Sequence, residues 1–154
     1  MTVNVLGVDL ELDIYDVDVY EKFEQEVRKV KQRVDNPPKG QVQTNAQALK
    51  FQCIVVKDFF DAVFGPGTAE EMFHGKNNIK DCNDAYLAVI EAAGSMMNDY
   101  ADSMNSRFAE MNAKYSPEDD QPIVYHASPR IIGPIAPAGP NRAQRRNSAK
   151  KKKH

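Results

Sequence analysis

The sequence has no tryptophan, only two cysteines and only three histidines among its 154 residues. So few thiols argue against a disulfide framework and favour a reducing, cytosolic setting. No apolar run approaches the roughly 20 residues that a membrane-spanning helix needs, and the first residues do not resemble a secretory signal. The contents of 42% hydrophobic and 27% charged residues are typical of a globular protein. We therefore expect one globular domain with no membrane association.

The combinations of side chains that serve catalysis are also missing. His74 falls in a predicted short turn, whereas His126 and His154 come much later, so no nucleophile has an evident base beside it. Cys53 and Cys82 stand singly on helical seams, which predicts buried, unreactive thiols rather than zinc ligands. No complete phosphate-binding glycine loop or EF-hand loop is present. We expect no enzyme activity, no cofactor and no metal.

Acidic and basic residues are unevenly distributed along the chain. Residues 1–115 contain 12 Lys and Arg against 19 Asp and Glu, whereas the last 14 residues contain seven basic residues and no acidic one. These basic residues are Arg142, Arg145, Arg146 and Lys150 to Lys153. The pattern predicts an acidic body with a basic tail. Such a tail could bind phosphates or an acidic protein surface, or could simply keep the chain in solution.

The N-terminal third predicts a hairpin and a helix. Apolar residues recur at every second position in residues 3–5 and again in residues 8–14, where acidic residues separate them. Leu6-Gly7 allows a tight reversal, so we expect two antiparallel strands. From Tyr20 to Val34 the apolar residues recur every three or four positions, which predicts a helix with Asp18 as its N-cap. Because a lone hairpin is marginal in water, it must pack on the rest of the chain.

Two further helices are predicted before the centre of the chain. Residues 42–64 have the widest apolar face, including Leu49 and Ile54, so this helix is expected to be the most deeply buried. After Gly65-Pro66-Gly67, Thr68 and Glu71 form a capping-box pattern that opens a short helical turn, which closes near Gly75.

The last regular element begins near Asn78, and its apolar residues recur every three or four positions as far as Tyr115. Unbroken, it would be nearly forty residues long, or roughly 55 Å. Gly94 is the only helix breaker within it, so one helix and two collinear helices are both possible. A body of this size cannot bury both ends, and the half beyond Met96 should therefore fold back or protrude.

That far half is rich in methionine and aromatic residues. Methionine adapts its shape and is favoured on surfaces that accept varied partners. An ordinary core position and a self-association seam remain the alternatives, the latter giving a homo-oligomer. The residues predicted to contact a partner are Met97, Tyr100, Met104, Phe108 and Met111, followed by Arg142, Arg145 and Arg146 of the basic tail.

The periodicity ends at Ser116-Pro117, and six of the nine prolines lie from Pro117 onward. We predict that residues 117–154 are extended or disordered. The expected fold is thus mostly α: residues 1–116 form an N-terminal β-hairpin and a small helical bundle with one long C-terminal helix, and a disordered basic tail follows.

Several segments together resemble a known family. They are Asp58-Phe59-Phe60-Asp61 leading to Phe64-Gly65-Pro66-Gly67, then Tyr115-Ser116-Pro117, and Asn141-Arg142-Ala143-Gln144-Arg145-Arg146. The order resembles that of the tail assembly chaperones of long-tailed (siphovirus-type) phages of Gram-positive bacteria. In that family the Tyr-Ser-Pro and Asn-Arg-Ala segments nearly adjoin, whereas here residues 118–139 separate them.

The resemblance implies a binding function in the host cytoplasm. Such chaperones coat the helical tape measure protein, keep it soluble and help to recruit tail tube protein subunits; a frameshifted longer form is common. Two rivals remain. One is a nucleic-acid-binding accessory protein acting through the basic tail, although the acidic body would repel phosphate and residues 141–154 offer no aromatic ring for stacking. The other is a structural tail subunit.

Overall fold

The structure is a computed structural model that describes residues 1–115, and it is mostly helical with a two-stranded hairpin at its N-terminus. This confirms the predicted fold class for that part of the chain. The predicted disordered tail, residues 117–154, lies outside the described residues. The elements in chain order are β1 (Thr2–Val5), β2 (Val8–Glu11), α1 (Val17–Asp35), α2 (Asn45–Phe64), α3 (Thr68–Phe73) and α4 (Ile79–Tyr115).

The hairpin forms as its alternation predicts. β1 and β2 pair antiparallel, with Val5 opposite Val8, and the reversal falls at Leu6 and Gly7. Both turn residues have positive φ, 53° and 83°, which is unusual for a leucine. Val5 and Leu10 turn into the core, whereas the acidic residues of β2 remain exposed.

Helix α1 spans nearly the predicted range, but its predicted cap is wrong. Asp16, not Asp18, is the N-cap: its carboxylate accepts hydrogen bonds from the backbone N–H groups of Asp18 and Val19. The cap is displaced because the helix begins at Val17, which places Asp18 inside the first turn. There its charge still suits the positive end of the helix dipole.

Helix α2 begins later than predicted, at Asn45. Thr44 and Gln47 form a capping box, since each side chain bonds the other residue's backbone N–H. Burial begins only near residue 51, so the prediction of a buried seam is right for the second half and wrong for Leu49 and Ile54, which are exposed. Leu49 is 46% exposed and Ile54 40%, so the described residues leave part of the apolar face of α2 uncovered.

The predicted capping box of α3 is also wrong. Gly67 is the N-cap and offers no side chain, and the hydroxyl of Thr68 instead donates to the carbonyl of Gly65. The carboxylate of Asp61 on α2 accepts the backbone N–H of Ala69 at 2.9 Å, and so caps α3 from a neighbouring helix. The short helix ends at His74, which has a left-handed backbone before Gly75.

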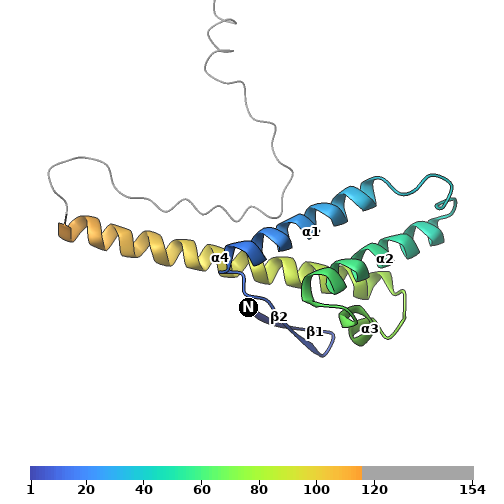
Figure 1. Cartoon of the computed structure of the whole chain (residues 1–154), viewed down its shortest axis with the longest axis horizontal. Coiled ribbons are helices and arrows are strands. Elements are labelled where there is room, and N and C mark those ends of the chain that lie inside the picture. Colours follow the sequence, from blue (N-terminus) through green and yellow to red (C-terminus); the bar gives the residue numbers. More distant parts are fainter. Residues whose placement is uncertain (116–154) are drawn as a thin grey trace, which may run out of the picture.

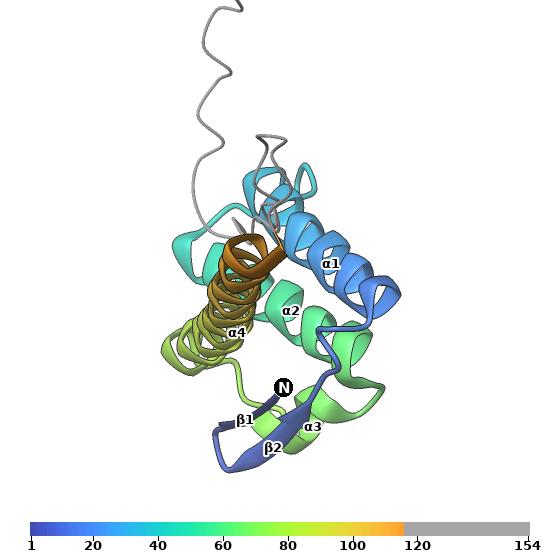
Figure 2. The ribbon, with the colours of Figure 1, turned by 90° about the vertical axis from the view of Figure 1, so that its left-hand side faces the viewer.

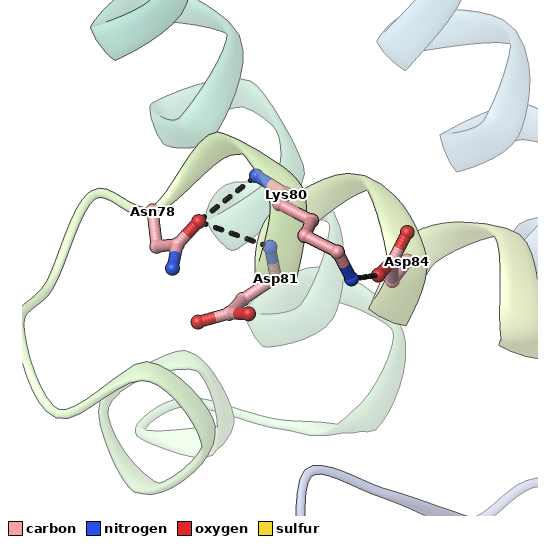
Figure 3. A network of polar contacts seen from close by, with 4 residues as sticks. All are labelled: Asn78, Lys80, Asp81 and Asp84. Atoms are coloured by element: carbon pink, nitrogen blue, oxygen red, sulfur yellow. Dashed lines mark hydrogen bonds and ion pairs between the residues drawn. The ribbon is translucent and has the colours of Figure 1, made fainter.

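Helix α4 is one continuous helix of 37 residues, about 55 Å long, and Gly94 does not interrupt it. The amide oxygen of Asn78 accepts the backbone N–H groups of Lys80 and Asp81 and so opens the helix, as Figure 3 shows. In the next turn the ammonium of Lys80 pairs with the carboxylate of Asp84.

Helix α2 is the centre of the body, with α1 packed on one side and α4 on the other, while β1 contacts α4 (Figures 1 and 2). Aromatic rings fill the middle, where Phe59 lies edge-on to both Phe23 and Tyr86. Phe60 stacks edge-on against Phe73 of α3. The body covers only the first part of α4, and the remainder extends away from it in Figure 1.

Candidate protein-interaction surface

The long helix leaves the body near residue 101. Ala101, 8% exposed, is the last buried residue of α4 among those described. The connection between β2 and α1 contacts α4 at this point. The centroid of the Tyr15 ring, in that connection, lies 5.3 Å from the centroid of the Tyr100 ring. Ile14, beside it in sequence, is fully buried, although it lies outside the main core cluster. The described part of α4 beyond this point protrudes rather than folding back.

The predicted partner residues of α4 all lie on this protruding part or at its base. Met97, Met104 and Phe108 are partly exposed, whereas Met111 is 48% exposed. Tyr100 is 38% exposed and contacts Tyr15. The structure therefore brings them together on one helix and does not bury them in the core.

Six apolar residues form a narrow band along this segment, which we call the distal stripe. Its members are Met97, Ala101, Met104, Phe108, Met111 and Tyr115. Successive members are four and three residues apart in strict alternation. At about 100° per residue, all six fall within an arc of roughly 80° on the helix surface. Beyond Ala101, which is 8% exposed, Met104 and Phe108 are partly exposed, and exposure reaches 48% at Met111 and 66% at Tyr115.

The two edges of the distal stripe differ in charge. Tyr100, Arg107 and Lys114 follow one edge, seven residues or about two turns apart. Asn98, Asn105 and Asn112 follow the other edge. The acidic residues of the segment lie near the opposite face of the helix, by the same 100° rotation; they are Asp99, Asp102 and Glu110. The stripe is thus apolar, bordered by cations on one side and by amides on the other.

The two cysteines are confirmed as buried thiols. Cys53 and Cys82 are both 0% exposed and unbridged. Burial, together with a hydrogen bond to the Cys53 thiol, raises the pKa of Cys82 to about 12. A thiol with so high a pKa has almost no thiolate at neutral pH and is a poor nucleophile.

Two tyrosines are perturbed in the same direction. Burial, with a smaller contribution from the carboxylate of Glu24, raises the pKa of Tyr20 to about 12. Burial alone raises the pKa of Tyr86 to about 12. Both rings belong to the aromatic core, so these shifts reflect packing rather than a reaction centre.

Two small pockets lie on the body, and neither includes a residue of the distal stripe. One, of about 240 Å³, lies between the hairpin turn at Leu6 and the segment from Met72 to Asp81. The other, of about 210 Å³, lies where α1, α2 and the first turns of α4 meet, beside Tyr86. Within residues 1–115 no group of His, Cys, Asp or Glu side chains is arranged to hold a metal ion.

None of the helices that the structure describes is both long and apolar enough to cross a bilayer. The other predicted contacts, Arg142, Arg145 and Arg146, lie outside the described residues. Sequence reasoning missed two members of the surface: Ala101, whose small side chain gives little hydrophobic signal, and Tyr15, which nothing in the local pattern links to α4. It also missed the strict alternation of spacings, which emerges once α4 is known to be unbroken.

A comparison with known protein families assigns the chain to one of them. Residues 6–149 match the model of a family described as a family of unknown function, DUF6673, and the chain therefore belongs to that family. No curated protein and no solved structure matches the chain.

Proposed function

We propose that this protein is a phage tail assembly chaperone, which binds the helical tape measure protein and helps to recruit tail tube subunits in the host cytoplasm. One observation carries the proposal: the distal stripe lies on the last 19 residues of α4, Met97 to Tyr115, and the part beyond Ala101 extends away from the body. The segment is about 28 Å long and presents methionine and aromatic side chains to solvent. A second helix could pack along the part beyond Ala101, which is about four turns long.

The acidic body and the basic C-terminal residues support a division of roles. The stripe binds the apolar face of the tape measure helix, while Arg142, Arg145 and Arg146 bind an acidic surface of the tail tube protein. The resemblance of the Asp-Phe-Phe-Asp, Tyr-Ser-Pro and Asn-Arg-Ala-Gln-Arg-Arg segments to tail assembly chaperones supplies the identity of these partners.

Co-expression tests the proposal. A tape measure protein from the same genome is produced alone, with the full chain, and with each of two variants. Phe108→Asp places a charge in the distal stripe, whereas Ala109→Asp places the same charge on the next, exposed residue outside it. We expect the full chain and Ala109→Asp to keep the tape measure protein soluble and Phe108→Asp to lose this effect. Equal insolubility in all four samples would contradict the proposal.

The rivals give different outcomes. An electrophoretic shift of DNA or RNA at low salt that disappears when residues 141–154 are deleted would favour nucleic-acid binding. Stable rings or tubes formed by the purified chain alone would favour a structural tail subunit.

A further inference from the structure

We propose that the distal stripe pairs, in coiled-coil fashion, with a heptad-repeat helix of another protein whose edge facing Arg107 and Lys114 carries Asp or Glu. This inference rests on the proposed function for the identity of the client, and it specifies the chemistry that the client helix must have.

The spacing of the stripe supports helical pairing. Steps of four and three in alternation give a seven-residue repeat, with Met97, Met104 and Met111 at one core position and Ala101, Phe108 and Tyr115 at the other. A repeat of 3.5 residues keeps a seam facing a second helix when the two supercoil to the left. A stripe of roughly 80° is also narrower than the apolar arc of at least 100° that a helix packed into a globular core usually has.

The residues beside the seam indicate which partner fits. In a coiled coil the positions that border the core form interhelical ion pairs and determine the choice of partner. Here one border carries Tyr100 followed by the cations Arg107 and Lys114, and the other carries amides. The acidic residues of the segment lie on the far face and cannot reach across the seam. Acidic side chains on the facing edge of the partner helix would form ion pairs with Arg107 and Lys114.

A second copy of this chain fits less well. In a parallel pair, Arg107 and Lys114 would face the asparagine border of the other copy, with no opposite charge. In an antiparallel pair the cationic borders would face each other and repel. Ala101 is moreover already buried by its own chain, so the bodies of two parallel copies would meet where the seam begins.

Synthetic peptides test this directly with the full chain. The first peptide has three heptads with Leu and Ile in the core positions and Glu at both borders; the second has Lys in place of those Glu residues. A third contains the first peptide's residues in scrambled order. Binding is measured by the fluorescence anisotropy of labelled peptide. We expect the Glu peptide to bind about tenfold or more tightly than the Lys peptide at low salt, and the scrambled peptide to bind least.

Charge reversal makes the test specific to the stripe. In the double variant Arg107→Glu, Lys114→Glu the preference should invert in favour of the Lys peptide. The matched control, Lys22→Glu, Lys50→Glu, changes the net charge equally at two exposed lysines of α1 and α2, and should keep the original preference. The proposal would be overturned if the Arg107→Glu, Lys114→Glu variant still preferred the Glu peptide, or if the scrambled peptide bound as tightly as the Glu peptide. In either case the basic C-terminal residues would account for the attraction.

Three further outcomes separate the possibilities. Sedimentation of the full chain as a concentration-dependent dimer, dispersed by Phe108→Asp and not by Ala109→Asp, would assign the stripe to a second copy and overturn the proposal. If the tape measure protein is kept soluble but the Glu peptide does not bind, the inference fails and the proposed function stands. If the peptide binds as expected but the tape measure protein stays insoluble, the proposed function fails and the inference stands.

Discussion

The ring of Tyr15 packs against the ring of Tyr100, with centroids 5.3 Å apart and planes inclined at 52°. This contact joins the connection between β2 and α1 to α4 at the point where the helix leaves the body. It therefore holds the base of the protruding part of α4, whose described residues beyond Ala101 include none that is buried.

A double-mutant cycle should detect this contact. Aromatic pairs contribute about 0.5–1.5 kcal/mol beyond the area they bury, and we expect the lower half of that range because both rings are well exposed. The free energy of unfolding is measured in urea for Tyr15→Ala, Tyr100→Ala and the double variant. Strictly additive losses would show that the rings do not interact in solution.

The hydroxyl of Tyr20 should be dispensable for stability. It is buried, and no group among the described residues forms a hydrogen bond with it. Because an unsatisfied buried polar group costs about 1–3 kcal/mol, Tyr20→Phe is expected to leave stability unchanged or to raise it by up to about 1 kcal/mol. Tyr15→Phe, at an exposed ring, serves as the control and should have no effect. A clear loss of stability in Tyr20→Phe would contradict the burial of a lone hydroxyl.

Stability should decline in alkali. Burial raises the pKa of Tyr20, Tyr86 and Cys82 to about 12, from ordinary values of 10.0, 10.0 and 9.0. Between about pH 9 and 12 the folded chain therefore holds protons that the unfolded chain releases, so the free energy of unfolding should fall as the pH rises through this range. The urea midpoint measured against pH shows this, and Tyr86→Phe should make the decline shallower. A midpoint independent of pH over that window would rule out the burial of these groups.

Periodicity predicted the elements but not their ends. The alternation in residues 3–14 and the three-and-four spacing to Tyr115 each reflect a single apolar face, which is a local property of the chain. The caps depend on which residue first adopts helical geometry, and so Asp16 replaced Asp18. The N–H group of Ala69 is capped by Asp61 from another helix, a long-range contact that no local pattern contains.

The candidate surface was predictable in its residues but not in its arrangement. The Met and aromatic residues after Met96 were identified because a helix of that length exceeds a small body. Whether the segment folds back depends on the conformation at Gly94, and sequence alone allowed both one helix and two. The contact of Tyr15 with Tyr100 joins residues 85 positions apart and could be found only from the fold.

Gly94 should tolerate a side chain. It lies inside the continuous helix α4, and a Cβ built on it would meet nothing within 4 Å. Gly94→Ala is therefore expected to stabilise the chain by about 0.5–1 kcal/mol, measured by urea unfolding, since glycine is the poorer helix former. Gly67→Ala should have the opposite sign, because Gly67 has a φ of +91° that alanine adopts only with strain. Destabilisation by Gly94→Ala would indicate a break in α4.

Substitutions at two phenylalanines should show the difference in packing between the core and the protruding part of α4. Phe60 is 0% exposed and lies against Phe59, Phe64 and Phe73, so Phe60→Ala should cost about 3–5 kcal/mol of unfolding free energy. Phe108 lies seven residues beyond the last buried position of α4, and Phe108→Ala should cost less than about 1 kcal/mol. Urea unfolding followed by circular dichroism measures both variants. A loss at Phe108 as large as that at Phe60 would mean that the distal stripe is packed within the folded monomer, which would leave no apolar surface for a partner helix.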